Sequence, residues 1–197
     1  SRTEIPVLSD EHRWRPFQLA FMLMSLSSVA NPVDEDRSNV DLLWFPTGGG
    51  KTEAYLGLTA FSIFLRRFRN GIIGDGVTVL MRYTLRLLTI QQFQRAATLI
   101  MACETIRREI PDKLGPEPIS LGLWVGGSAT PNSLKDAGEA LTKLLSGERV
   151  LEGNPYQILN CPWCGTTLTP RDYRIAGNMT IQCPNDKCNF RDGMPLY

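Results

Sequence analysis

Four stretches of the chain carry apolar residues at helical spacing, and we expect each of them to form a helix. The predicted helices span residues 15–30, 52–69, 87–110 and 132–145. Pro16 suits a first helical turn, because proline lacks the backbone N–H that this turn leaves unpaired. The first two stretches are apolar on nearly every side, so we expect both helices to be buried.

Three short apolar runs alternate with these helices. They span residues 40–45, 77–82 and 119–125, and the first and third are followed by glycine-rich turns. The resulting β-α-β-α-β order predicts an α/β fold with a parallel sheet and helices on its faces. Ligands of such sheets bind beyond the carboxyl ends of the strands. Functional residues are therefore expected at these strand ends.

A glycine-rich loop follows the first predicted strand and precedes the second predicted helix. Its residues are Pro46, Thr47, Gly48, Gly49, Gly50, Lys51, Thr52 and Glu53. Glycines allow successive backbone N–H groups to turn toward phosphate oxygens, and the positive end of the helix adds to the attraction. Lys51 is placed to neutralise the β and γ phosphates, and the Thr52 hydroxyl to bind Mg²⁺. The order of strand, loop and helix favours nucleotide binding over a glycine-rich hairpin with an exposed lysine.

The form of this loop resembles motif I of superfamily-two helicases and translocases, in which the first glycine is often replaced, as it is here by Phe45. The segment Arg15-Pro16-Phe17-Gln18 resembles the upstream element in which a glutamine reads adenine. Because an amide pairs with both N6 and N7 of adenine, this role suits Gln18, although an exposed helix glutamine is the alternative. The resemblance implies a RecA-like phosphate-loop lobe that binds ATP and Mg²⁺.

Two further segments resemble helicase elements that track a nucleic-acid backbone. Residues 84–91 resemble motif Ia, which implies DNA contacts by Thr84, Arg86 and Gln91. Gly126 and Gly127 resemble the glycine doublet that allows DNA to approach a strand end. An arginine in a solvated loop and an ordinary Gly-Gly turn remain alternatives for these two segments.

Taken together, the motifs of residues 14–190 resemble the helicase components of bacterial DISARM anti-phage systems. This resemblance implies an ATP-driven DNA helicase or translocase that works with a second subunit in phage defence. It does not follow from composition or periodicity.

Four cysteines near the end of the chain have spacings typical of a structural zinc site. Cys161 and Cys164 form a Cys-x₂-Cys pair, and Cys183 and Cys188 form a Cys-x₄-Cys pair. The segment between the pairs predicts a hairpin with a Gly-Asn turn, which completes a zinc-ribbon shape. Disulfides and an iron–sulfur cluster are the alternatives. Cys103 lies among apolar helical residues and is expected to be a buried core residue.

Composition narrows the class of protein. The 197 residues include 21 Lys and Arg and 20 Asp and Glu, which gives a net charge of +1. Because the whole chain is not basic, any surface that binds DNA must be a local cluster of basic residues. The first residues lack the features of a secretory signal, and the apolar stretches are too short to cross a bilayer. We expect a cytoplasmic protein with no membrane partner.

The motifs divide the chain into a partial RecA-like lobe (1–146), a linker (147–160), a zinc ribbon (161–192) and a possible start of the next core strand (193–197). A phosphate-loop ATPase needs a second strand that ends in a carboxylate, the Walker B element, and this sequence contains none. We therefore expect the chain to be the N-terminal part of a larger motor, inactive in hydrolysis by itself.

Two other classes of protein remain open. The first is a zinc-ribbon adaptor for nucleic acid that carries a degenerate, non-hydrolysing nucleotide site, a class that the missing carboxylates leave open. The second is a small-molecule kinase or GTPase. The absence of an Asn-Lys-x-Asp element and the presence of Phe45 in the loop count against this second class.

Overall fold

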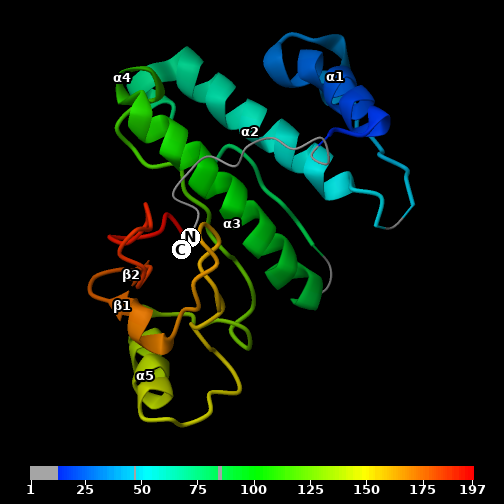
Figure 1. Ribbon diagram of the computed structural model, residues 1–197. Helices are drawn as coiled ribbons and strands as arrows, with labels where there is room; N and C mark the ends of the chain where they lie inside the picture. Colours follow the sequence, from blue (N-terminus) through cyan, green and yellow to red (C-terminus); the bar gives the residue numbers. More distant parts are fainter. Residues whose placement is uncertain (1–12, 47, 84–85) are drawn as a thin grey trace. The chain divides into compact units, whose positions relative to one another are not determined.

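The computed structural model describes residues 13–46, 48–83 and 86–197, and these residues combine helices with one small antiparallel sheet (Figure 1). They divide into two compact units. Unit 1 contains Tyr83–Ile106 and Pro118–Tyr197, apart from residues 84 and 85. Unit 2 contains the described residues as far as Arg82, together with Arg107–Glu117.

All four predicted helices are confirmed, and each end lies within two residues of its expected position. The α-helices are α1 (Pro16–Ala30), α2 (Lys51–Asn70), α3 (Arg86–Glu109), α4 (Pro111–Leu114) and α5 (Leu134–Leu145). Short 3-10 helices span Glu35–Ser38, Gly71–Ile73 and Pro170–Asp172. None of the described helices has the length and apolar character needed to cross a membrane.

Helices α1 and α2 pack against each other in unit 2 (Figure 1). Gly57 of α2 marks a close approach, because a Cβ at this position would lie 2.7 Å from Sδ of Met22. The rings of Phe21 and Tyr55 meet edge to face, with centroids 5.4 Å apart. This packing covers one side of α1.

The expectation that α1 is buried throughout was wrong. Leu23 is 67% exposed and Met24 is 76% exposed, and Gln18 and Ser25 are the buried residues of the helix. The physical reason is that α1 is apolar around most of its circumference, whereas a single neighbouring helix covers only one stripe.

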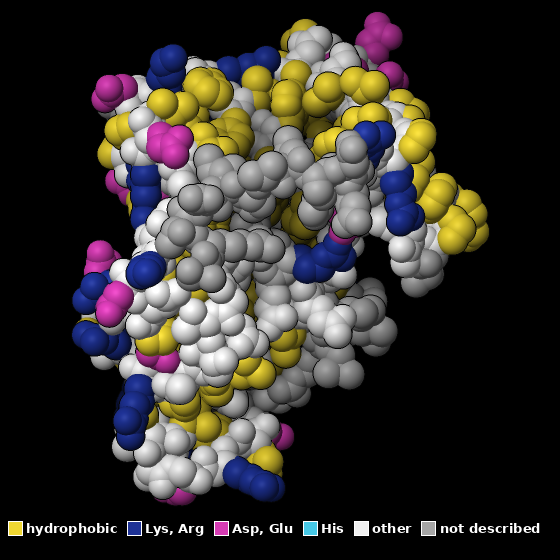
Figure 2. Space-filling view, viewed as in Figure 1, with side chains coloured by type: hydrophobic (Ala, Val, Ile, Leu, Met, Phe, Trp, Pro, Cys, Tyr) yellow, Lys and Arg dark blue, Asp and Glu magenta, His cyan; other side chains and the backbone are white. Residues whose placement is uncertain are grey.

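The first two predicted strands are not paired as strands within the described residues. Residues 40–45 and 77–82 lie in unit 2, and their hydrophobic side chains include exposed ones such as Trp44 (88%) and Leu80 (88%). Hydrophobic side chains are also visible on the surface near the top of Figure 2. An extended segment becomes a strand only when a neighbour pairs with its backbone, so an apolar run does not suffice.

The third predicted strand has a partial partner in unit 1. Leu121 and Leu196 form an isolated parallel bridge. The amide of Tyr197 donates to the carbonyl of Leu121 (2.9 Å). The amide of Leu123 donates to the carbonyl of Tyr197 (2.8 Å). The larger parallel sheet stays a prediction, as do the domain boundaries.

The predicted hairpin between the cysteine pairs is confirmed. Strands β1 (Tyr173–Ile175) and β2 (Met179–Ile181) pair antiparallel, with Ile175 opposite Met179. Gly177 in the connecting turn has a φ of +78°, a conformation that glycine adopts without the strain a Cβ would add. The hairpin packs into the core of unit 1, whose fully buried members include Met101, Ile158, Leu168, Phe190 and Leu196.

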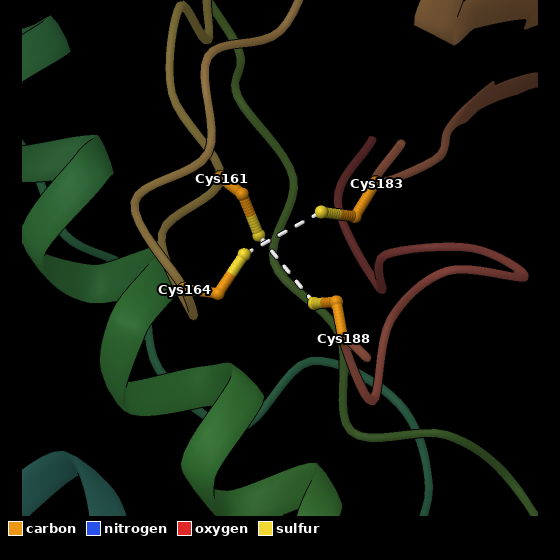
Figure 3. A group of neighbouring side chains, drawn as sticks. All are labelled: Cys161, Cys164, Cys183 and Cys188. Atoms are coloured by element: carbon orange, nitrogen blue, oxygen red, sulfur yellow. Dashed lines mark hydrogen bonds between the residues drawn. The ribbon is translucent and has the colours of Figure 1, made fainter. Parts of the chain in front are cut away.

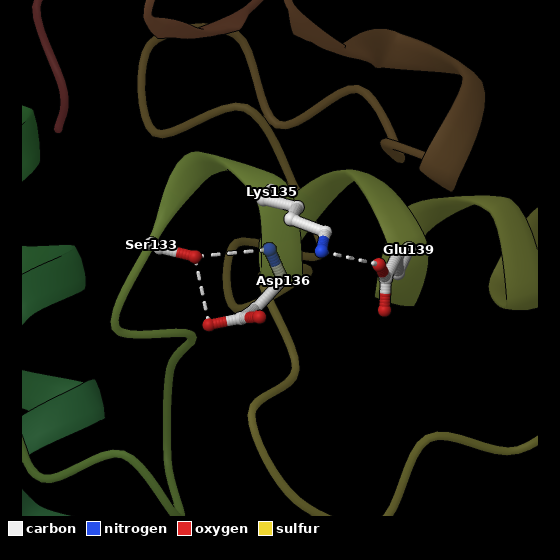
Figure 4. Close-up of polar contacts among 4 residues, drawn as sticks. All are labelled: Ser133, Lys135, Asp136 and Glu139. Carbon is white, nitrogen blue, oxygen red and sulfur yellow. Dashed lines mark hydrogen bonds and ion pairs between the residues drawn. The ribbon is translucent and has the colours of Figure 1, made fainter.

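Ser133 caps the amino-terminal end of α5 (Figure 4). Its Oγ accepts a hydrogen bond from the amide of Asp136 (3.1 Å) and lies 2.7 Å from Oδ2 of the same residue. Lys135 and Glu139 form an exposed i,i+4 pair at 4.0 Å, which contributes little to stability. The cap satisfies one amide that the first turn would otherwise leave unpaired.

Candidate functional site

The glycine-rich loop lies directly before α2 in unit 2. Gly48 and Gly50 have positive φ angles of 78° and 91°, and Gly50 is the residue that caps the helix. The amide of Gly49 donates to the carbonyl of Pro46 (3.1 Å), which closes a turn inside the loop. Thr47 lies outside the described residues. The loop therefore leads directly into a 20-residue helix, whose first amide groups have no hydrogen-bond partners within the helix.

Lys51, the first residue of α2, folds back over the loop. Its Nζ donates to the carbonyl oxygen of Phe45 and lies 3.4 Å from that of Pro46. A phosphate group that enters the loop would compete with these neutral carbonyls for the ammonium, and an anion forms the stronger hydrogen bond. Thr52 and Glu53 follow in the first turn of the helix, and both are half-buried.

The start of α1 contacts the loop at three points. Nη1 of Arg15 donates to the carbonyl of Gly49 (2.8 Å), and Nε2 of Gln18 donates to that of Gly50 (2.7 Å). The ring of Phe17 stacks on that of Phe45, with centroids 3.8 Å apart and an angle of 12° between the planes. Gln18 is only 4% exposed, and its role in reading adenine stays a prediction.

The predicted DNA-contacting residues with described positions belong to unit 1. Thr84 lies outside the described residues, and Arg86 is the first residue of α3. Gln91 is exposed on the same helix. A Cβ at Gly126 would meet no atom within 4 Å, whereas one at Gly127 would lie 2.6 Å from Nδ2 of Asn132. The space beside the Cα of Gly126 is thus empty, whereas the space beside the Cα of Gly127 is filled by the side chain of Asn132.

The four predicted zinc ligands converge in unit 1 (Figure 3). Their sulfur atoms all lie within 4.8 Å of one another. The Sγ atoms of Cys161 and Cys188 are 3.9 Å apart, and those of Cys164 and Cys183 are 3.5 Å apart. A tetrahedral zinc with bonds of about 2.3 Å separates its sulfur ligands by about 3.8 Å, whereas a disulfide needs about 2.05 Å. The four cysteines are free and could hold a metal ion such as zinc.

Neighbouring groups position the cysteine sulfurs. Oγ1 of Thr166 lies 3.1 Å from Sγ of Cys164, and Nδ2 of Asn185 lies 3.7 Å from the same sulfur. Gly165, directly after Cys164, has a φ of +77°, and its amide donates to the carbonyl of Cys161 (2.8 Å). These contacts shape the first pair as a tight knuckle.

The surroundings of three of the thiols change their pKa values. Burial raises the pKa of Cys161 and raises that of Cys188 to about 12. Burial also opposes ionisation of Cys164, but hydrogen bonds from Thr166 and from neighbouring thiols outweigh it and lower its pKa to about 6. The hydrogen bonds around Cys164 thus favour its thiolate form.

Metal binding should release at least two protons at pH 7.5. Cys161 and Cys188 are protonated at this pH because their pKa values are raised, and both must ionise to bind zinc. Zinc affinity should accordingly rise by about 100-fold or more per pH unit near neutrality. If the metal-free segment is unfolded, more protons leave, since an ordinary thiol has a pKa of about 8.5. Calorimetric titration in buffers of different ionisation enthalpy counts the protons, and a count below one would contradict four-thiolate binding.

A cavity of about 280 Å³ also lies in unit 1. Phe93, Leu123, Ile158 and Leu196 are among its apolar lining residues, and Asn132 is among its polar ones. None of the predicted site residues lines it. The cavity is therefore distinct from the candidate metal centre of the same unit.

Sequence reasoning missed three residues that act around these sites. Arg15 belongs to the motif that contains Gln18, but the motif assigns it no contact. Its hydrogen bond to the carbonyl of Gly49 joins residues that are 34 positions apart in the sequence. Thr166 and Asn185 approach the sulfur of Cys164, and the position of Thr166 just after the Cys-x₂-Cys-Gly knuckle is the one local signal that could have indicated it.

Comparison with known proteins gives one strong likeness. No family model and no solved structure matches the chain. The DISARM protein DrmA of Bacillus paralicheniformis is 41% identical over 214 aligned positions, which cover 98% of this chain and 19% of that protein. The chain thus spans about a fifth of the length of this curated relative. The resemblance to DISARM proteins that the motifs indicated is confirmed, and it extends along nearly the whole of this chain.

Proposed function

We propose that this chain supplies the ATP-binding part of a DNA helicase or translocase that acts in anti-phage defence. The observation that carries the proposal is the loop from Pro46 to Thr52, whose left-handed Gly50 leads into the amino-terminal end of α2. Amide groups at a helix start attract anions, and Lys51 adds a positive charge beside them. The likeness to a DISARM protein supports the role in defence.

In this proposal, ATP binds with its phosphates against the loop and with Mg²⁺ at the hydroxyl of Thr52. Gln18 contacts either the adenine edge or the carbonyl of Gly50 in the loop. DNA passes along the backbone near Thr84, Arg86, Gln91, Gly126 and Gly127 without being read for sequence. The parallel sheet of a RecA-like lobe would arise when the extended segments gain strand partners, among them a Walker B strand.

The cysteine centre has a structural role in the proposal. Four protein thiolates complete a tetrahedral shell, so no position stays open for a substrate. A second candidate function follows from the same observation, namely a zinc-ribbon adaptor that binds nucleic acid and does not hydrolyse ATP. We further propose that the protein works in the cytoplasm with a second subunit of the defence complex.

The test is ATP hydrolysis by the full-length protein, with and without single-stranded and double-stranded DNA. Lys51→Ala should lower DNA-stimulated hydrolysis by roughly 10- to 150-fold, the value of a lost hydrogen bond to a charged group. Lys135→Ala, which removes an exposed lysine from α5, is the matched control and should leave the rate unchanged.

A rate of ATP hydrolysis that does not change when DNA is added, or that is unchanged in Lys51→Ala, would refute the motor proposal. Binding of DNA without any hydrolysis, lost when the metal is removed, would instead favour the adaptor.

A further inference from the structure

We infer that Arg15 and Gln18 orient the amide groups of the phosphate loop, so that both act as positioning residues for the polyphosphate part of a nucleotide. This inference rests on the proposed function of the loop. It assigns Arg15 a role in positioning the loop. It also assigns Gln18 a role in binding the phosphates in place of a role in binding the base.

The two side chains hold two successive carbonyl groups. Nη1 of Arg15 donates to the oxygen of Gly49 at 2.8 Å, and Nε2 of Gln18 donates to the oxygen of Gly50 at 2.7 Å. Both distances are short for bonds between nitrogen and oxygen, and the bond from Arg15 is assisted by its charge. The start of α1 therefore fixes two adjacent peptide groups of the loop.

Anchoring a carbonyl also sets the direction of the next amide. In a planar trans peptide the C=O and the following N–H point in opposite directions. Because Arg15 and Gln18 hold the oxygens of Gly49 and Gly50 on the α1 side, the amides of Gly50 and Lys51 must point away from α1. Within the part of the chain that the structure describes, neither amide has a hydrogen-bond acceptor. Two oriented and available donors are what a phosphate group requires.

The two anchors are coupled to each other. Oε1 of Gln18 accepts a hydrogen bond from the amide of Arg15 at 2.7 Å, so each residue holds the other in place. Pro16 between them has a restricted φ angle, which reduces the freedom of this corner. A Cβ at Gly50 would lie 2.7 Å from Nε2 of Gln18, so the carbonyl contact depends on glycine at this position.

The surroundings of Gln18 argue against a primary role in reading the base. Its side chain is 4% exposed, and both ends of its amide already bind backbone groups. To reach adenine, the amide would have to break its bonds to Gly50 and to the backbone of Arg15, which is unfavourable. The geometry thus favours a ligand class defined by its phosphates rather than by its base.

The test compares three ligands on the full-length protein: ATP, GTP and inorganic tripolyphosphate, each with Mg²⁺. Gln18→Ala and Arg15→Ala should weaken binding of all three by a similar factor, roughly 5- to 30-fold, and leave the ratio of ATP to GTP affinity unchanged. Arg15→Lys should recover part of the loss, since an ammonium can still donate to the carbonyl of Gly49. Arg15 is exposed, so its substitution should leave the thermal unfolding midpoint unchanged.

Arg37→Ala is the matched control. Nη1 of Arg37 donates to the carbonyl of Ser28 near the other end of α1 (2.7 Å), which is the same kind of bond away from the loop. This variant should bind all three ligands as the wild type does. An equal loss in Arg37→Ala would mean that α1 acts only through its general stability, and the inference would fail.

Two other results would overturn the inference. If Gln18→Ala weakens ATP binding but leaves tripolyphosphate unaffected, Gln18 reads the base. If Arg15→Ala binds all ligands normally, its carbonyl contact has no positioning role. Failure of the proposed function looks different, because the wild type would then bind none of the three ligands, or would bind them no better than Lys51→Ala does.

Discussion

Removal of the metal ion should unfold the cysteine-bearing part of unit 1. Cys161, Cys183 and Cys188 are buried in the same core cluster as Phe190 and Met194, so the candidate metal centre and the core form one structure. Structural zinc contributes roughly 10–16 kcal/mol in isolated zinc-finger peptides at pH 7. This is as large as the whole net stability of a typical domain, about 5–15 kcal/mol. The segment should therefore not stay folded without its metal.

Two measurements check this expectation. A chelator titration should abolish the near-ultraviolet circular dichroism of the segment, in which Trp163 lies against Phe190 with centroids 5.5 Å apart. Metal analysis of Cys161→Ser should find less than half an equivalent of zinc, because a serine hydroxyl does not replace a thiolate.

Cys103→Ala provides the matched control. Cys103 is buried on α3, and burial raises its pKa to about 11, so it stays a neutral thiol at pH 7. The variant should retain one equivalent of metal. A chain that keeps its near-ultraviolet signal after complete removal of the metal would show that the apolar core suffices without it.

Phe190→Ala should destabilise unit 1 by about 3–5 kcal/mol, the usual cost of removing a large aromatic side chain from a core. Phe190 is fully buried, and its carbonyl accepts a hydrogen bond from the amide of Cys183 (3.2 Å), one of the candidate ligands. The substitution leaves a cavity beside the metal centre, and Phe190→Leu should cost less because it fills more of that space.

Denaturant unfolding of the metal-loaded chain measures this effect. Trp124→Ala is the matched aromatic control, since Trp124 is 99% exposed and its loss should change the free energy of unfolding by less than about 0.5 kcal/mol. Equal effects of the two substitutions would show that Phe190 is not part of the core that unfolds.

The helices and the hairpin could be predicted because their signals are local. Pro16 and Ser133 lie at helix starts, and Gly177 lies in the hairpin turn, as their backbone preferences require. The first two predicted strands could not be predicted in this way, because their signal is not local. Residues 40–45 and 77–82 have the composition of strands, but pairing depends on a neighbour that no local pattern specifies.

The candidate sites divide in the same way. The cysteine spacings indicated which four residues meet, because two short knuckles need only to approach each other. The glycine-rich loop could be located from contiguous residues, and the structure has it directly before α2, whereas its binding of phosphate stays a prediction. The anchor at Arg15 could not, since its bond to Gly49 spans 34 positions and depends on how α1 packs on α2.

Local sequence therefore settles where this chain forms helices, where it turns, and which four cysteines are candidate metal ligands. These properties depend on backbone preferences and on side-chain types within a few positions. Tertiary packing alone decides that Gln18 and Arg15 hold loop carbonyls, that α1 leaves Leu23 and Met24 exposed, and that Leu121 pairs with Leu196. Each of these depends on which distant segment comes within about 3 Å of a polar group or covers an apolar one, and that is set by the packing of whole elements.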